Sequence, residues 1–174
     1  MNAHGLSLQP LADEAQAQAC ARMMAGMDPW VRLGRDYAAC LRLLTNPAKE
    51  VMVATSDEGV EGFIVLDMTG PFVGYIQILC VRPAAQRHGL GQLLIQWAEE
   101  RIHRVSPNVY ICVSSFNTRA RALYERVGFE YVGTLKDLIV KGYDEILLRK
   151  SIGPISSFTP PPAAPSAGPA MPRA

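Results

Sequence analysis

Leu79-Cys80-Val81-Arg82-Pro83-Ala84-Ala85-Gln86-Arg87-His88-Gly89-Leu90-Gly91 is the stretch that decides the fold, because an apolar run stops at Pro83 and a Gly-x-Gly follows a short polar turn. Residues 92–102 then repeat apolar side chains at helical spacing. The pattern predicts a strand, a tight loop and the N-terminus of an amphipathic helix. Such a junction presents unpaired backbone N–H groups and a positive helix end, which suit a phosphate or pyrophosphate. Gly89 and Gly91 would let the backbone approach that anion without a Cβ in the way.

Two common phosphate-binding motifs do not fit this loop. A dinucleotide fingerprint needs a third glycine, where this chain has Leu94, and it needs an early βαβ unit. A P-loop would end in Gly-Lys followed by Ser or Thr, which is missing. Taken alone, Gly89 and Gly91 could also serve only to let the chain turn tightly between the strand and the helix, without binding any anion.

The composition is that of one soluble globular domain, with 174 residues, 49% apolar, 19% charged and a net charge of +1. This charge gives no reason to expect nucleic acid or a membrane surface as a partner. Residues 1–10 lack the pattern of a signal peptide, and no apolar run approaches the roughly 20 residues that span a bilayer.

The four cysteines, Cys20, Cys40, Cys80 and Cys112, are far apart and form no CxxC pair. Metal-ligand spacing is absent, so we expect no metal site. Unpaired cysteines of this kind are typical of a reducing compartment, and we therefore expect a cytoplasmic protein.

The remaining chain predicts a mixed α/β order of elements. The expected elements are a strand at 6–8, helices at 13–24 and 33–44, strands at 50–55, 60–67 and 73–81, the central helix, a strand at 109–113, a helix at 119–127, and strands at 130–138 and 143–148. We expect the domain to cover residues 1–152. Residues 153–174 are rich in Pro, Ala and Ser and predict a disordered tail.

Two blocks of sequence together resemble a known family. The spacing Leu79-x-Val81-x-Pro83-x-x-Gln86-x-x-Gly89-x-Gly91 resembles the signature motif of the GNAT superfamily of N-acetyltransferases. Asn117-x-x-Ala120-x-x-Leu123-Tyr124-x-x-x-Gly128-Phe129 resembles the second conserved block of that family. The resemblance covers roughly residues 6–150. It implies the acyl-CoA N-acyltransferase fold, a mixed and mostly antiparallel sheet flanked by helices.

The resemblance also implies acetyl-CoA as the donor of an acetyl group. Backbone N–H groups of the loop would hold its pyrophosphate, and the pantetheine arm would lie along the preceding strand like an added strand. Asn117 would contact the arm while capping its helix. The cofactor-binding residues expected on this basis are Leu79, Cys80, Val81, Arg87, His88, Gly89, Leu90, Gly91, Gln92 and Asn117.

The family reaction is direct attack of an amine on the thioester, without an acyl-enzyme. The resemblance makes Tyr124 the proton donor to the departing thiolate. A core aromatic on the stripe with Ala120 and Leu123 is the alternative for this residue. Members that acetylate ribosomal-protein N-termini often carry a Glu five positions before the Asn, where this chain has Cys112. No base is assigned, and Gln77, Tyr75 and Glu58 are polar candidates near the expected cleft.

The sequence leaves the acceptor open. We expect Trp30, Gln77 and Tyr143 to contact it, from the regions that commonly recognise substrates in this fold. A small amine is the first expectation, and the α-amino group of a protein N-terminus is the alternative. A non-catalytic acyl-CoA-binding sensor is the alternative from another class. Homodimers are frequent in the family, so a homodimer is a further expectation.

Overall fold

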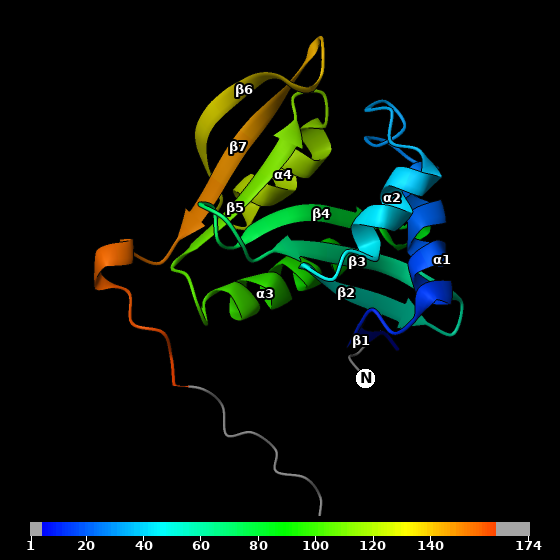
Figure 1. Cartoon of the computed structure of the whole chain (residues 1–174), viewed down its shortest axis with the longest axis horizontal. Coiled ribbons are helices and arrows are strands. Elements are labelled where there is room, and N and C mark those ends of the chain that lie inside the picture. The colour runs from blue at the N-terminus through cyan, green and yellow to red at the C-terminus, as the bar shows by residue number, and fades with distance from the viewer. Residues whose placement is uncertain (1–4, 163–174) are drawn as a thin grey trace, which may run out of the picture.

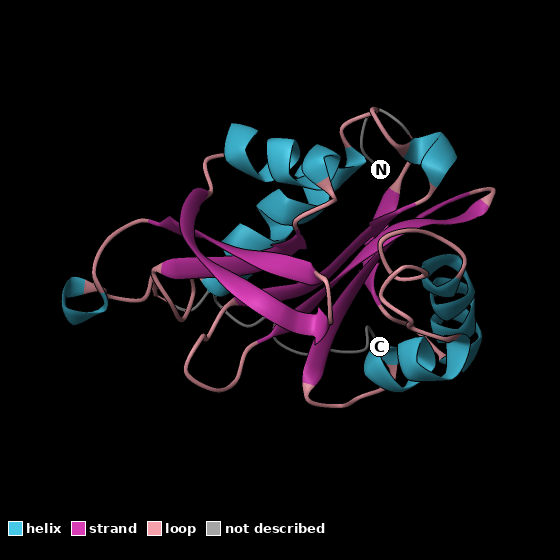
Figure 2. Ribbon diagram, turned by 90° about the horizontal axis from the view of Figure 1, so that it is seen from above, coloured by secondary structure: helices cyan, strands magenta, loops and turns pink. Residues whose placement is uncertain are grey.

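The computed structural model describes residues 5–162. One seven-stranded sheet has helices on both faces, as Figures 1 and 2 show. The elements in chain order are β1 (Ser7–Pro10), α1 (Glu14–Ala25), α2 (Tyr37–Leu44), β2 (Lys49–Ser56), β3 (Gly59–Asp67), β4 (Tyr75–Val81), the 3-10 helix η1 (Pro83–Ala85), α3 (Leu90–Ile102), β5 (Asn108–Ser114), α4 (Thr118–Arg126), β6 (Glu130–Val140), β7 (Tyr143–Ser151) and the 3-10 helix η2 (Ile155–Ser157).

The strand order is β1-β2-β3-β4-β5-β7-β6. Neighbouring strands are antiparallel except β4 and β5, which are parallel. The final strand β7 therefore lies between β5 and β6 (Figure 1). This mixed, mostly antiparallel sheet flanked by helices confirms the predicted fold.

Two apolar clusters hold the helices on the sheet. On one face α1 and α2 bury Met24, Cys40 and Leu44 against strands β2 to β4. On the opposite face α3 buries Leu94 and Ile102 in a cluster that also takes in β5, β7 and α4. Because the two clusters lie on opposite faces, the sheet is covered on both sides, and its central strands carry apolar side chains toward both layers of helices.

The second helix begins later than predicted. The sequence predicts a helix from residue 33, but α2 begins at Tyr37. Gly34 has a φ of 68°, and Asp36 caps the helix by accepting a hydrogen bond from the N–H of Ala39 at 2.7 Å. A left-handed residue followed by a side-chain cap marks a helix start, so residues 27–35 form a loop instead.

The C-terminal tail is described only to residue 162, and its predicted disorder beyond that point lies outside the described residues. Residues 153–162 hold the short turn η2 and expose most of their side chains. In the part of the chain that the structure describes, the helices are too short or too polar to cross a membrane.

Candidate active site

A cavity of about 660 Å³ opens beside the loop that joins β4 to α3. The end of β4, the loop, the start of α3 and one side of α4 all contribute to its walls. The predicted site residues that line it are Trp30, Leu79, Val81, Arg87, Gly89, Gly91, Gln92, Asn117 and Tyr124. The structure thus brings most of the expected cofactor-binding residues to one cavity.

The loop adopts a conformation suited to an anion. Arg87 has a φ of 73° and Gly89 a φ of 82°, both in the left-handed region. Successive N–H groups in such a turn, followed by a helix N-terminus, form a concave nest for negative charge. A Cβ on Gly89 would meet nothing within 4 Å, whereas a Cβ on Gly91 would lie 3.2 Å from Leu123. Gly89 therefore serves the loop conformation, and Gly91 allows α3 to approach α4 closely.

Gln86 joins the loop to two neighbouring elements. Its side-chain amide donates to the carbonyl of Val81 at 2.9 Å, and its side-chain oxygen accepts from Arg119 on α4 at 2.6 Å. These bonds fix the loop between β4 and α4. Arg119 lines the same cavity as Arg87 and Arg126, so three arginines contribute to its wall.

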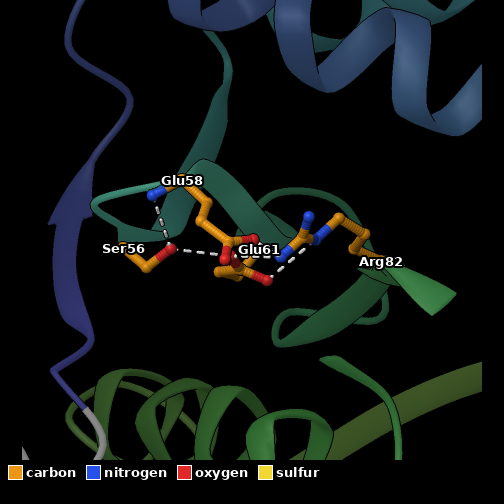
Figure 3. Close-up of polar contacts among 4 residues, drawn as sticks. All are labelled: Ser56, Glu58, Glu61 and Arg82. Carbon is orange, nitrogen blue, oxygen red and sulfur yellow. Dashed lines mark hydrogen bonds and ion pairs between the residues drawn. The ribbon is translucent and has the colours of Figure 1, made fainter. Parts of the chain in front are cut away.

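A second set of bonds holds the other side of the loop (Figure 3). The Arg82 guanidinium donates to both oxygens of the buried Glu61, at 3.0 and 2.7 Å. Ser56 donates to Glu61 at 2.7 Å, and Arg82 also pairs with Glu58 at 2.8 Å. Glu58 therefore belongs to this network, on a different surface depression, and not to the expected cleft.

The strands β4 and β5 separate within the sheet. They pair only at Tyr75 with Tyr110 and Ile76 with Ile111, and no register pairs follow toward Val81. A second cavity of about 240 Å³ lies at this split. The β4 edge beyond Ile76 is thus free to receive an extended ligand arm as an added strand.

A buried carboxylate occupies the second cavity. Glu145 of β7 faces Ser114 of β5 in the strand register, and its side chain accepts a hydrogen bond from the Ser114 hydroxyl at 2.5 Å. Only 3% of Glu145 is exposed. Burial raises the pKa of this carboxyl above its ordinary value, while the Ser114 hydrogen bond and the charge of Arg35 oppose the rise.

The pKa values of two tyrosines at the site, Tyr124 and Tyr75, are also shifted. Burial, followed by the nearby charge of Glu145, raises the pKa of Tyr124. Burial likewise raises the pKa of Tyr75, with Cys112 and Glu145 adding to the effect. Both hydroxyls therefore stay protonated at neutral pH, which a proton donor requires.

Some predicted site residues line neither of these two cavities. Cys80 is fully buried with its sulfur 3.7 Å from that of Met27, Leu90 is a core residue, and His88 lines the depression beside Arg82. Any contact of these three with a ligand in the first cavity would use backbone atoms. Tyr143 packs edge-on against Phe116, with 4.9 Å between ring centroids.

Trp30 and Gln77, which were predicted to contact the acceptor, both line the second cavity. Trp30 lines both cavities, and Gln77 lines the second one. The side-chain oxygen of Gln77 is buried without a hydrogen-bond partner among the described residues. Both residues thus face the space where an acceptor would approach a donor held in the first cavity.

Glu145, Ser114 and the two α4 arginines were not predicted from the sequence. Arg119 and Arg126 could have been found from their helical spacing on the face that carries Leu123. Glu145 gave no such signal, because its position opposite Ser114 depends on β7 pairing directly with β5.

Comparisons with known proteins agree with this arrangement. Residues 8–129 match the model of the acetyltransferase (GNAT) family. The N-alpha-acetyltransferase RimI of Mycobacterium tuberculosis is 33% identical over 147 residues, which cover 80% of this chain and 89% of the relative.

Solved structures show the same fold at lower identity. The chain superposes on Arabidopsis thaliana NAA60 in complex with a bisubstrate analogue with a TM-score of 0.70, at 16% identity, covering 84% of this chain and 97% of the other. Aminoglycoside 6'-acetyltransferase type Ii gives a TM-score of 0.69 at 17% identity, covering 86% and 97%. The sequence matches show that this chain belongs to the acetyltransferase (GNAT) family and is an acetyl-CoA-dependent N-acetyltransferase, and the separation of β4 from β5 beside a glycine-containing loop agrees with this.

Proposed function

We propose that this enzyme transfers the acetyl group of acetyl-CoA to the α-amino group of a peptide or protein N-terminus, by direct attack in a ternary complex. The observation that carries the proposal is the polar content of the second cavity. It holds a single carboxylate, Glu145, which is buried and whose pKa is raised. The relative that is 33% identical is an N-alpha-acetyltransferase.

The energetics of the amine favour this acceptor. Deprotonating an α-amine of pKa about 8 at pH 7 costs about 1.4 kcal/mol, whereas a lysine of pKa about 10.4 costs about 4.6 kcal/mol. A site whose single carboxylate is buried suits the first amine better, because less proton affinity is needed to deprotonate it. The chain has Cys112 where related N-terminal acetyltransferases often carry a Glu, which strengthens the preference for an amine that is easily deprotonated.

In the proposed complex the first cavity holds acetyl-CoA. Backbone N–H groups from Arg87 to Gln92 bind the pyrophosphate, and the cavity arginines add positive charge. The pantetheine arm lies on the β4 edge at Leu79 and Val81, beside Asn117. This placement carries the thioester toward the second cavity, which adjoins the first at Asn117 and Tyr124.

Tyr124 is the proposed proton donor to the departing thiolate. Its ring is buried between the two cavities, and no hydrogen bond of its hydroxyl to another described residue competes for the proton. Backbone N–H groups of the separated β4 edge polarise the thioester carbonyl.

A small amine, the acceptor that the sequence favours, is the second candidate. The second cavity measures only about 240 Å³. The Arg32 guanidinium lies 4.6 Å from the centre of the Phe116 ring, which joins the α1–α2 loop to Tyr143. A compact cavity of this kind suits a small molecule.

Thiol release separates the candidates. The protein is incubated with acetyl-CoA and three acceptor sets: peptides with free N-termini and no lysine, the same peptides with blocked N-termini and one lysine, and small polyamines. We expect release with the first set at a kcat/KM at least tenfold above the others. Preference for polyamines would support the second candidate, and preference for lysine would contradict both.

A further inference from the structure

Glu145 lies in the sheet close to Cys112, the position where related N-terminal acetyltransferases often carry a glutamate. In the β5–β7 register Cys112 faces Leu147 and Ser114 faces Glu145. Residues two apart on a strand share a face, and Cys112, Ser114 and Glu145 all line the second cavity. Glu145 on β7 thus lies one strand across from Cys112 and two register pairs along the sheet.

Glu145 is a buried carboxylate without an ion pair among residues 5–162. Burying an unpaired charge is costly, and such carboxylates in proteins are usually paired. Here the structure gives the side chain one hydrogen bond, from Ser114, and its second oxygen has no partner among the described residues. That oxygen is available to a cation or to the N–H of a group bound in the cavity.

The groups that face Glu145 come from every element around it. They are Arg35 from the α1–α2 loop, Tyr75 from β4, Cys112 and Ser114 from β5, and Tyr124 from α4. Arg35 acts at a distance and forms no ion pair with the carboxylate in the described chain. The negative charge of Glu145 opposes ionisation of Tyr124, so the proton states of these two residues are linked.

We propose that Glu145 is the general base of this enzyme, accepting the proton of the acceptor ammonium directly or across one water. The inference rests on the acetyltransferase function but not on which amine is the acceptor. It assigns to β7 the carboxylate that the Cys112 position on β5 lacks.

The proton transfers balance as follows. One ammonium proton passes to Glu145, which leaves a lone pair on nitrogen. The nitrogen forms the bond to the acetyl carbon as the carbon–sulfur bond breaks, and the thiolate takes the proton of Tyr124. The second nitrogen proton returns to the Tyr124 phenolate, and Glu145 releases its proton to solvent.

The order of these steps follows from charge. Once Glu145 is protonated, the negative charge that opposes Tyr124 ionisation has gone. Tyr124 is then a stronger acid at the moment when the thiolate leaves. The two residues thus act in sequence, base first and acid second.

The test is the pH dependence of Glu145→Gln, measured with whichever acceptor set in the thiol-release assay gives turnover. A base is needed while the amine is protonated and is dispensable once the amine is neutral. For an α-amine of pKa about 8, we expect kcat to fall at least tenfold at pH 7 and by less than about threefold at pH 9.5. Affinity for acetyl-CoA should not change. A defect of equal size at every pH would overturn the assignment.

Ser114→Ala provides a second measurement with the carboxylate in place. The Ser114 hydrogen bond lowers the pKa of Glu145, so its loss raises that pKa further. The acidic limb of the kcat profile should move to higher pH while the plateau stays within about twofold. An unmoved limb would contradict the role of Glu145.

Glu99→Gln is the matched control, because it removes another largely buried carboxylate, one that pairs with Lys150 at 2.8 Å outside both cavities. It should lower the melting temperature and leave the pH profile unchanged. Turnover with lysine or polyamines, combined with a pH-dependent defect in Glu145→Gln, would refute the proposed acceptor and support the base. Turnover with none of the amines would overturn both.

Discussion

Tyr124 combines a packing role and a proposed chemical role in one side chain. Tyr124 is 5% exposed, its ring tilts against Phe129 with 6.1 Å between centroids, and the residue lines both cavities. Tyr124→Phe keeps the ring and removes the proton. We expect kcat to fall at least tenfold, because the thiolate then leaves without a donor.

Calorimetry supplies the control for Tyr124→Phe. The affinity for acetyl-CoA and the melting temperature should match those of the unaltered protein, because the ring and its contacts are retained. Full turnover in the variant would remove Tyr124 from the mechanism and leave it a core aromatic.

A substitution at Gly89 tests the proposed anion-binding loop. Gly89→Glu places a carboxylate in the loop that would hold the pyrophosphate, so we expect acetyl-CoA binding to be lost. Gly70→Glu is the matched control, since Gly70 has a similar φ of 72° and equally open space around a Cβ, but lies in the turn after β3. Calorimetry that shows equal affinity in both variants would refute the pyrophosphate assignment.

The loop and α4 were predictable because their residues are local in sequence. Gly89, Asn117 and Tyr124 stand at fixed spacings inside two short blocks, and Asn117 caps α4 by accepting from the N–H of Ala120 at 3.2 Å. Glu145 was not predictable in this way. Its partner Ser114 is 31 residues away, and the two meet only because β7 inserts between β5 and β6.

At the scale of elements, the end of β4 is fixed to β3 by side chains as well as by backbone. The Arg82 N–H donates to the carbonyl of Glu61 at 2.8 Å, and its guanidinium forms two bonds to the Glu61 carboxylate. The loop that follows begins directly at Pro83. The pair therefore sets where the anion-binding loop leaves the sheet.

Arg82→Gln should consequently weaken acetyl-CoA binding as well as stability, because it leaves the buried Glu61 without its cation. Arg101→Gln is the control, since Arg101 forms a similar two-bond pair with Glu50 at the far end of α3, at 2.7 and 2.5 Å. We expect both variants to melt at lower temperature and only Arg82→Gln to lose affinity. Equal affinity in the two would show that the pair supports the fold alone.

The start of α2 illustrates a limit of pattern analysis at this scale. Apolar spacing extends back to residue 33, but the left-handed Gly34 and the Asp36 cap make the helix begin only at Tyr37. The spacing of apolar residues carries no information on backbone conformation, so the prediction extended the helix over residues that form a loop. The difference matters because that loop carries Trp30 to both cavities.

At the scale of the whole molecule, both proposed half-sites belong to residues before 152. Ile152 donates to the carbonyl of Pro107 at 3.0 Å, and no residue from 153 to 162 lines the first or the second cavity of the active site. A chain of residues 1–152 should therefore keep the kcat and the melting temperature of the full chain. A loss of more than about threefold in kcat would place part of the tail in the active enzyme. The cytoplasmic location and a homodimer stay predictions.

The split sheet gives the molecule two adjoining cavities, one suited to acetyl-CoA and one to an amine, with Tyr124 between them. The most direct measurement is mass spectrometry of a single peptide that carries both a free α-amine and a lysine, after incubation with the enzyme and acetyl-CoA. We expect one acetyl group, located by fragmentation on the α-amine of the first residue. Acetyl on the lysine, or an unmodified peptide, would contradict α-amine transfer.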